Sequence, residues 1–480
     1  MLVFSLLYFA FITIIFAIYY SVANKYKPYV LFFASIIFIT SISMRVALFS
    51  VLFATINYFL GLILYQVREK GKIKNNLFWL SIAIDVGFLS FFKYFNFFSG
   101  GVDSLFSLLR ISWKIPYLNI ILPIGISYYT FQALGYLIRI DRGSEKAETD
   151  FGTFALYLLF FPKFLSGPVE RSNHFFPQMK NPGTMKWDPV YQGLRLFLWG
   201  LFKKIVIANN LFGPVSLVYG HVQNYSGVSF IIVFLVQTIY IYFDFSGYTD
   251  MALGTAKIFG INLIDNFNRP FLAKNISEFW RRWHISLSSW CNDFIYNPFI
   301  VKFRRFGNAA VVTGIFLTFF IVGIWHGANR TFVILGVLQG IAIVYEFYSK
   351  KNRLKIASKF PKSVVNTFSR IVVFLFMNFS MVFFYSNSVS DAWYLISHLF
   401  SNLQFNSNEF SFISHKPEFV FALFCFVVIL IMEMYIEKGK DLMSIYLKKP
   451  LWIHWIGYLT CIVLIYIFRS EIGSFYYMRF

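Results

Sequence analysis

Charged residues are scarce in this chain, since Asp, Glu, Lys and Arg make up only 14% of its 480 residues. A soluble globular protein carries about 25% charged residues, so a chain of this composition cannot cover a water-facing surface of its size. Hydrophobic residues make up 58%, aromatic residues make up 22%, and the mean hydropathy is +0.62. These values exclude a disordered chain and a coiled coil, and they predict a helical membrane protein with several spans.

Acidic residues are about half as common as basic ones, with 22 Asp and Glu against 43 Lys and Arg and a net charge of +21. In a soluble protein this excess would suggest a nucleic-acid partner. Here many basic residues form short clusters between apolar runs, for example from Arg68 to Lys74. Such clusters are typical of the cytoplasmic ends of membrane spans, so we expect contact with membrane lipid and no nucleic-acid partner.

Several structural and catalytic motifs are missing. The three cysteines, Cys291, Cys425 and Cys461, form no CxxC pattern, so neither a disulfide framework nor a cysteine zinc site is predicted. The sequence has no HExxH motif, no glycine-rich phosphate loop and no GxSxG motif. We therefore expect no bound metal, no bound cofactor and no nucleotide-driven pump. No basic region precedes the first apolar run, so it is predicted to be a retained span rather than a signal peptide.

Apolar runs suited to crossing a bilayer recur along the chain. They predict an all-α, polytopic membrane protein with about 11–13 hydrophobic helices, some of them re-entrant or interfacial, in one integral membrane domain over residues 1–480. The span at 29–43 is short, and the one at 191–218 contains Lys203 and Lys204. The candidate spans are 2–22, 29–43, 46–65, 76–98, 119–138, 151–167, 191–218, 228–250, 308–326, 331–348, 367–387, 418–436 and 451–469.

The basic clusters also predict which ends of the spans face the cytoplasm. The clusters are Lys25 and Lys27, Arg68 to Lys74, Lys302 to Arg305, Lys350 to Lys355, and Lys438 to Lys449. This pattern places the N-terminus and residues 327–330 on the outer side, although Arg330 opposes the second assignment. The polar stretch 388–417 is then an outer loop. No internal repeat is evident, which argues against a transporter built from two similar halves.

Residues 264–299 form an amphipathic segment within this apolar chain. Asn275 is predicted to cap a helix, with Glu278 as its capping-box partner. On a helix from about residue 276, one polar stripe is expected to hold Ser277, Arg281, His284, Ser288 and Cys291. The segment is predicted either to line a polar pocket or to lie flat in the membrane interface.

His326 ends a long apolar run, between Trp325 and Gly327, and Asn329 follows. A histidine embedded in a membrane is rare, so His326 is a functional candidate, with a structural hydrogen-bonding role as the alternative. Other polar residues are also enclosed by apolar sequence, and each alone indicates structure more than catalysis. They are Asp244, Ser246 and Gln132. Glu170 and Arg171 lie next to a predicted helix break, which is either an interfacial turn or backbone that lines a cavity.

Taken together, the motifs in residues 120–340 resemble the membrane-bound O-acyltransferase (MBOAT) family, in particular its bacterial alginate O-acetyltransferase branch. The motifs are LPIGISYYTFQ, FPKFLSGPVER, YFDFSGYTDMA, NFNRPF, FWRRWHISLSSW and IWHG. The resemblance implies a ring of helices around a polar tunnel that crosses the membrane. The enclosed polar residues expected to line this tunnel are Asp244, Ser246, Gln132, Glu170 and Arg171. It implies that His326 is the catalytic histidine and that His284 occupies the second active-site position.

The resemblance implies an O-acyltransferase of the cell (inner) membrane. The expected reaction moves an acetyl group from acetyl-CoA, or another acyl thioester, to a hydroxyl of a cell-surface polysaccharide, directly or through a periplasmic acetyltransferase partner. His326 would act as general base or as transient acyl carrier. Arg281, Ser288, Asn329 and Trp325 are weaker candidates for binding the substrates. The alternatives are transfer of D-alanyl or a longer acyl group to teichoic acid, lipid or protein, and a non-enzymatic glycan or lipid exporter.

Overall fold

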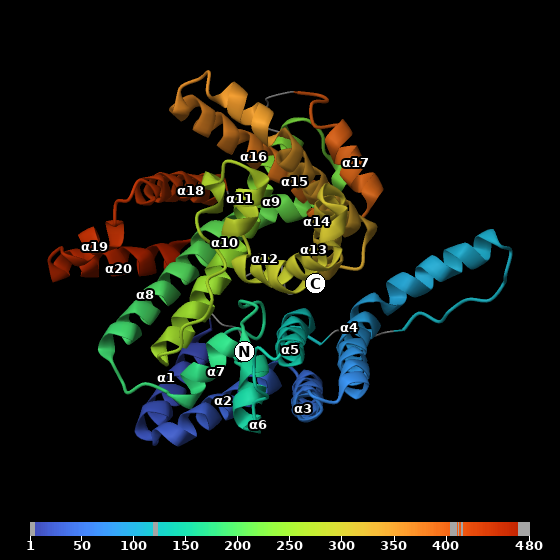
Figure 1. Cartoon of the computed structure of the whole chain (residues 1–480). Helices are drawn as coiled ribbons and strands as arrows, with labels where there is room; N and C mark the ends of the chain where they lie inside the picture. Colours follow the sequence, from blue (N-terminus) through green and yellow to red (C-terminus); the bar gives the residue numbers. More distant parts are fainter. Residues whose placement is uncertain (1–4, 119–122, 404–409, 411, 414–415, 469–480) are drawn as a thin grey trace. The chain divides into compact units, whose positions relative to one another are not determined.

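The computed structural model describes residues 5–118, 123–403, 410, 412, 413 and 416–468 (Figure 1). These residues are mostly helical and form no β-strand, apart from one isolated antiparallel bridge between Phe267 and Trp283. Contacts divide the chain into two compact units. One comprises residues 1–197 and 251–264, and the other comprises 198–250 and 265–480. The all-α prediction is confirmed.

The first unit is built from α1 to α7 and from parts of α8 and α10. Its helices are α1 (Leu6–Ser21), α2 (Lys27–Ile42), α3 (Met44–Gln66), α4 (Gly71–Leu108), α5 (Ile126–Asp141), α6 (Phe151–Leu159), α7 (Ser172–Lys180) and the first residues of α8 (Trp187–Phe202). Within this unit α3 packs against α5 and α6, and α4 packs against α5. Lys74 bonds the carboxylate of Asp141 at 2.9 Å, which ties the start of α4 to the end of α5.

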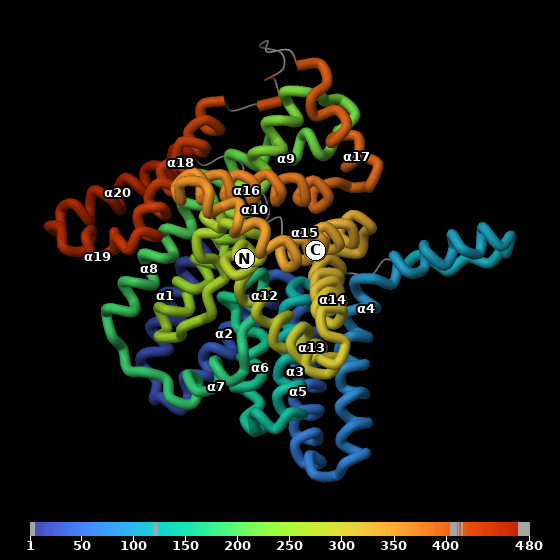
Figure 2. Tube along the Cα trace, turned by 45° about the horizontal axis from the view of Figure 1, so that its top comes forward, coloured from blue at the N-terminus to red at the C-terminus, as the bar shows by residue number. Residues whose placement is uncertain are grey.

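Helix α4 is longer than a bilayer is thick, because its 38 residues span about 57 Å at 1.5 Å per residue. Figure 2 shows its later half running away from α3 and α5. Polar side chains of α4 hold the segment that follows the helix against this half. Asn96 donates to the carbonyl of Leu118 at 2.8 Å, and the N–H of Ile115 donates to Asp103 at 2.9 Å.

The second unit contains the end of α8, most of α10 and the remaining helices. They are α9 (Asn209–Gly220), α10 (Val228–Ile258), α11 (Ile276–Arg282), α12 (Ile285–Cys291), α13 (Asn297–Phe303), α14 (Asn308–His326), α15 (Arg330–Ala357), α16 (Lys362–Tyr385), α17 (Val389–Ser397), α18 (Lys416–Glu437), α19 (Leu442–Leu447) and α20 (Leu451–Ile467). Helices α14 and α15 pack closely. A Cβ at Gly323 would lie 2.4 Å from the carbonyl oxygen of Phe332, and one at Gly336 would lie 2.3 Å from that of Phe319.

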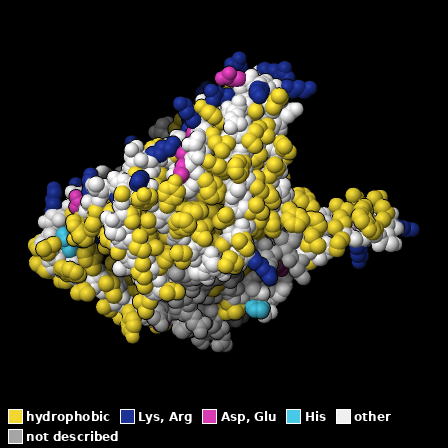
Figure 3. Space-filling view, turned by 90° about the horizontal axis from the view of Figure 1, so that it is seen from below, with side chains coloured by type: hydrophobic (Ala, Val, Ile, Leu, Met, Phe, Trp, Pro, Cys, Tyr) yellow, Lys and Arg dark blue, Asp and Glu magenta, His cyan; other side chains and the backbone are white. Residues whose placement is uncertain are grey.

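Nine helices in the described part of the chain are long and apolar enough to cross a membrane, and α1 and α20 are shorter apolar helices. Hydrophobic side chains dominate the described surface in Figure 3, as expected where protein faces lipid. The predicted outer loop 388–417 holds α17, and its residues 404–409, 411, 414 and 415 lie outside the described ones. The start of the predicted span 119–138, residues 119–122, also lies outside them.

The predicted span 191–218 exists as a continuous helical run, in spite of its two lysines. A π-helical turn, Lys203–Ala208, joins α8 to α9. Lys203 bonds Asp250 at 2.7 Å, and Lys204 bonds Asp244, with both side chains of the second pair almost fully buried. Each lysine charge is therefore balanced by a carboxylate on α10, which makes its burial tolerable.

The prediction of a span at 151–167 is wrong. Helix α6 ends at Leu159 after nine residues, too few to cross a bilayer. The chain then folds irregularly, and the buried Lys163 donates to Gln132 and to the carbonyl of Tyr157. Gly125, which starts α5 with a φ of 79°, allows the close packing here, because a Cβ there would lie 2.5 Å from the carbonyl oxygen of Phe164.

The prediction of one continuous helix from residue 276 through Cys291 is also wrong. The helix ends at Arg282, and a new helix starts at Ile285, because His284 adopts a left-handed conformation with φ 45° and ψ 50°. The predicted cap is confirmed: the side chain of Asn275 accepts from the N–H of Glu278 at 2.7 Å.

Candidate active site

His326 is the last residue of α14, and its side chain is buried in an aromatic pocket. Its ring lies 5.4 Å from that of Phe384 and 6.3 Å from that of Phe332, measured between centroids. Asn329 caps the next helix, since its Oδ1 accepts from the N–H of Thr331 and its Nδ2 donates to the carbonyl of Asn387. Asn329 thus ties the turn after His326 to the start of α15 and to the segment between α16 and α17.

His284 is buried at the break between α11 and α12. A left-handed conformation costs a residue other than glycine about 1–2 kcal/mol, so the surrounding structure must impose it. Residues held in such conformations are concentrated at functional sites. The strain at His284 is therefore consistent with the role that the sequence predicts for it.

Asn266 supplies the contacts that fix this break. Its backbone carbonyl accepts from the N–H of Ile285 at 2.9 Å, and its buried side-chain oxygen accepts from the hydroxyl of Ser286 at 2.5 Å. One step away, Phe267 pairs with Trp283 in the antiparallel bridge. Asn266 begins the NFNRPF motif, but the motif alone predicts no role for it. Its polar side chain, at the start of that motif in a mostly apolar chain, was the signal that could have marked it as a structural hydrogen-bonding residue.

Trp325 contacts both histidines. Its ring centroid lies 5.6 Å from that of His284 and 5.0 Å from that of His326. Phe245 of α10 completes the packing around His284, at 4.8 Å. The fold thus brings the two predicted catalytic histidines to one indole ring, although 41 residues separate them in the sequence.

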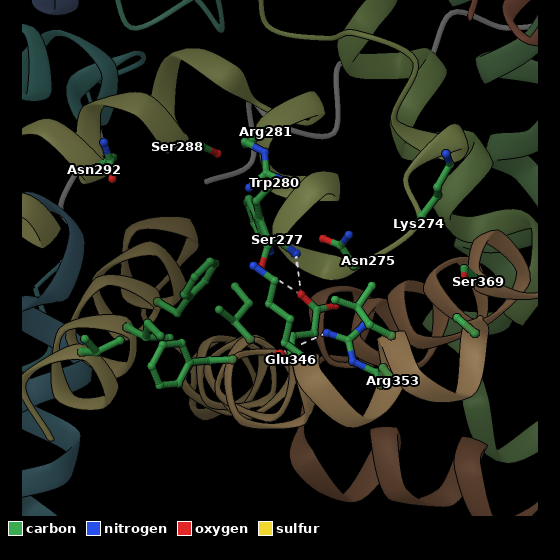
Figure 4. A pocket seen from close by; sticks show the side chains of 18 of the residues that line it. Lys274, Asn275, Ser277, Trp280, Arg281, Ser288, Asn292, Glu346, Arg353 and Ser369 are labelled. Carbon is green, nitrogen blue, oxygen red and sulfur yellow. Dashed lines mark hydrogen bonds between the residues drawn. The ribbon is translucent and has the colours of Figure 1, made fainter. Parts of the chain in front are cut away.

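A cavity of about 1500 Å³ lies beside these residues in the second unit. Residues of the predicted polar stripe line it, namely Ser277, Arg281, Ser288 and Cys291, whereas His284 does not. Figure 4 shows Arg281, Ser288 and Asn292 on one side of the cavity and Glu346 and Arg353 on the other. The cationic residues that line it are Lys274, Arg281, Lys350 and Arg353.

Glu346 is the acidic residue among those that line this cavity, and its charge is already engaged. Its carboxylate accepts from the backbone N–H of Ile276 at 2.5 Å, and from the N–H and the hydroxyl of Ser277 at 3.0 and 2.8 Å. These bonds satisfy the first backbone donors of α11. The cavity therefore keeps an excess of positive charge suited to an anionic molecule.

A second, much smaller void of about 10 Å³ lies next to His326. Three side chains line both spaces: Trp280, Phe319 and Val322. The large cavity thus reaches to within one layer of side chains of the histidine. This layer consists of apolar and aromatic groups, and it separates a basic chamber from the aromatic pocket of His326.

The predicted tunnel-lining residues are distributed over both units. In the second unit Asp244 pairs with Lys204, and Ser246 is buried. In the first, Gln132 accepts from Lys163, and Glu170 accepts from His174 at 2.8 Å. Arg171 is also buried there. None of the five predicted residues lines the two cavities described above, so their role in a tunnel stays a prediction.

Comparison with known proteins identifies the family. The model of MBOAT, the membrane-bound O-acyltransferase family, matches residues 144–388, a segment that contains both histidines. The "Probable alginate O-acetylase AlgI" of Pseudomonas aeruginosa is 32% identical over 395 residues, covering 82% of this chain and 73% of that protein. The chain belongs to the MBOAT family. It is an O-acyltransferase and a multi-pass membrane protein.

Other MBOAT relatives carry different acceptors in their names. The "Peptidoglycan O-acetyltransferase" of Helicobacter pylori is 32% identical over 367 residues, covering 70% of this chain and 66% of that protein. The "Teichoic acid D-alanyltransferase" of Bacillus subtilis is 30% identical over 259 residues, covering 49% of this chain and 62% of that protein. Among the described residues, no group of three or more His, Cys, Asp or Glu is arranged to hold a metal ion.

Proposed function

We propose that this protein transfers an acetyl group from cytoplasmic acetyl-CoA to a hydroxyl of a cell-surface polysaccharide, in the inner membrane. The acceptor is modified directly or through an extracytoplasmic acetyltransferase partner that relays the acetyl group. The observation that carries the proposal is the basic cavity that ends one side-chain layer from His326. The names of the alginate and peptidoglycan relatives support acetyl as the group and a glycan as the acceptor.

The cavity suits a donor that is both large and anionic. Coenzyme A carries phosphates, which Lys and Arg side chains bind as charge-assisted hydrogen-bond acceptors. Lys350 and Arg353 belong to a cluster that the sequence assigns to the cytoplasmic side. A cytoplasmic donor would therefore enter where its phosphates meet these cations, with its thioester directed toward Trp280 and His326.

His326 is proposed as the general base. The acceptor hydroxyl loses its proton to the imidazole as its oxygen attacks the thioester carbonyl, the new C–O bond forms, and the C–S bond breaks. The leaving thiolate then takes this proton from the imidazolium, which returns His326 to its neutral form. A base of this kind typically contributes about 10²–10⁴-fold to the rate. The buried aromatic surroundings of His326 exclude water that would otherwise hydrolyse the donor.

His284 is proposed to orient the donor or to stabilise the charge that develops on the carbonyl oxygen. Its position beside Trp325, held by Asn266, supports this role. The outer-side assignment of residues 327–330 supports an acceptor that approaches from outside. Asn329 and Trp325, next to His326, would then lie near the acceptor.

The test compares His326→Ala with His221→Ala, which removes an exposed histidine at the end of α9. The first variant should abolish O-acetylation of surface glycan while the protein remains in the membrane, measured by glycan mass spectrometry and immunoblotting. The control should acetylate normally. Unchanged acetylation in His326→Ala would refute the assignment, and loss of the polymer itself in a deletion strain would favour an exporter.

A further inference from the structure

We propose that Trp280 restricts the transferred acyl group to acetyl, by narrowing the passage between the large cavity and His326. This inference rests on the proposed function, because it concerns the donor that the cavity holds. It starts from the two spaces already described, which are separate in this structure and share the side chains of Trp280, Phe319 and Val322.

A chain of hydrogen bonds holds the Trp280 indole in place. Its Nε1 donates to Oε1 of Gln339 on α15 at 3.0 Å. The Nε2 of Gln339 in turn donates to the hydroxyl of Ser380 on α16 at 2.9 Å. The ring of Trp280 also meets that of Phe319 edge-on, with centroids 5.2 Å apart. All of these groups except Phe319 are buried, so rotating the indole would break a buried hydrogen bond.

The space beyond Trp280 is very small. A void needs about 10–15 Å³ to hold one water molecule, and the void beside His326 has about 10 Å³. This volume is at the lower limit for one water molecule, so acetyl, with a single methyl beyond its carbonyl, is the acyl group that needs the least movement of the wall. A propionyl group adds a methylene, and a D-alanyl group adds a methyl and an ammonium group. Each would have to displace Trp280, Phe384 or another wall residue.

Another part of the wall of the small void comes from the tight contact between two helices. Gly323 and Gly336 line the small void where α14 and α15 touch, and the backbones are so close there that a Cβ at either position would clash. Trp280 is the largest of the three side chains that line both spaces, so its removal would open the most space toward the donor cavity. Its fixed position would select acetyl over longer acyl groups.

The experiment measures release of free CoA by purified protein in detergent, with acetyl-, propionyl- and butyryl-CoA as donors and an oligosaccharide acceptor. Wild type should prefer acetyl, since one methylene in a hydrophobic pocket changes kcat/KM by about 10–200-fold. Trp280→Ala should lower the acetyl-to-propionyl ratio of kcat/KM at least about tenfold, through a gain with propionyl-CoA. Trp280→Phe, which retains an aromatic ring, should keep most of the preference.

The matched control is Trp290→Ala, which removes a buried tryptophan of α12 that lines neither space. It should leave the donor ratio unchanged. A wild type that uses butyryl-CoA as well as acetyl-CoA would overturn the inference even if Trp280→Ala did not fold. An unchanged ratio in folded Trp280→Ala would overturn it too, and both results would leave the proposed acyl transfer standing. A wild type that consumes no acyl-CoA would instead overturn the proposed donor and this inference together.

Discussion

Two groups of cations in the second unit have opposite surroundings. Lys203 and Lys204 lie inside a predicted span, and each faces a carboxylate on α10. The cations of the large cavity, such as Arg281 and Lys350, are exposed to it, and the carboxylate of Glu346 beside them is used to cap α11. The charges of the first group, here called the closed group, are neutralised by carboxylates of the fold. The second group, here called the open group, leaves positive charge for a ligand. Positive charge in this unit therefore favours ligand binding only where the fold supplies no balancing carboxylate.

Breaking one member of the closed group should have the largest effect on stability. Asp244→Leu leaves the charge of Lys204 without its carboxylate, at a cost of about 3–5 kcal/mol. We expect loss of folded protein from the membrane, measured by fluorescence-detected size exclusion of a tagged chain. The double variant Asp244→Leu, Lys204→Met should recover most of it, because both charges are removed. A double variant as unstable as the single would show that the pair has another role.

Asn266→Ala should have the next largest effect. Unlike loss of the Asp244–Lys204 ion pair, which lowers stability, it should mainly lower the catalytic rate. The substitution removes the acceptor of the Ser286 hydroxyl and relaxes the backbone at His284. Losing that buried hydrogen bond costs about 1–3 kcal/mol. We expect kcat to fall at least about tenfold, equal to 1.4 kcal/mol, with KM for acetyl-CoA little changed.

Asn266→Asp is the control for this prediction, because it keeps an oxygen at the same position. It should restore part of the lost kcat. If the two variants lose the same activity and stability, Asn266 serves only the general packing of the unit.

Removing a cation from the open group should weaken donor binding and little else. Arg281→Gln is expected to raise KM for acetyl-CoA about fivefold, equal to about 1 kcal/mol for a charge-assisted contact partly screened by water. The kcat and the melting temperature should be unchanged, since the interaction is equal in ground and transition states. Lys302→Gln, which removes an exposed cation outside the cavity, should leave KM unchanged. Equal effects of the two would place the donor elsewhere.

The sequence predicted features that depend on neighbours along the chain. Apolar runs located most spans, and side-chain periodicity placed Ser277, Arg281 and Ser288 on one polar surface, which lines the cavity. This prediction holds in spite of the break at His284, because α11 and α12 each direct polar side chains to the cavity. The break itself could not be read from periodicity, since it depends on pairing with Asn266, which lies 18 residues earlier.

Long-range contacts explain what the sequence did not reveal. The carboxylate that caps α11 comes from Glu346, and the partner of the Trp280 indole is Gln339, both on α15. Such partners follow from tertiary packing alone. The wrong span at 151–167 has a similar cause. Its composition is mostly apolar, but Pro162 has no backbone N–H and disfavours a helix there. The N–H of Phe161 donates instead to the hydroxyl of Ser35 on α2.

The smallest expected effect concerns an ion pair of which one partner is buried and the other is partly exposed. His174 of α7 is 42% exposed, and its Nδ1 lies 2.8 Å from the buried carboxylate of Glu170, which raises the pKa of His174 above its usual 6.5. The charged imidazole therefore stabilises the fold fully below pH 6.5, and this contribution is lost as the pH rises through the higher folded value. Water screens the exposed partner, so the change is small. The melting temperature of wild type should fall slightly across that range relative to His174→Gln, and parallel curves for the two proteins would contradict the pairing.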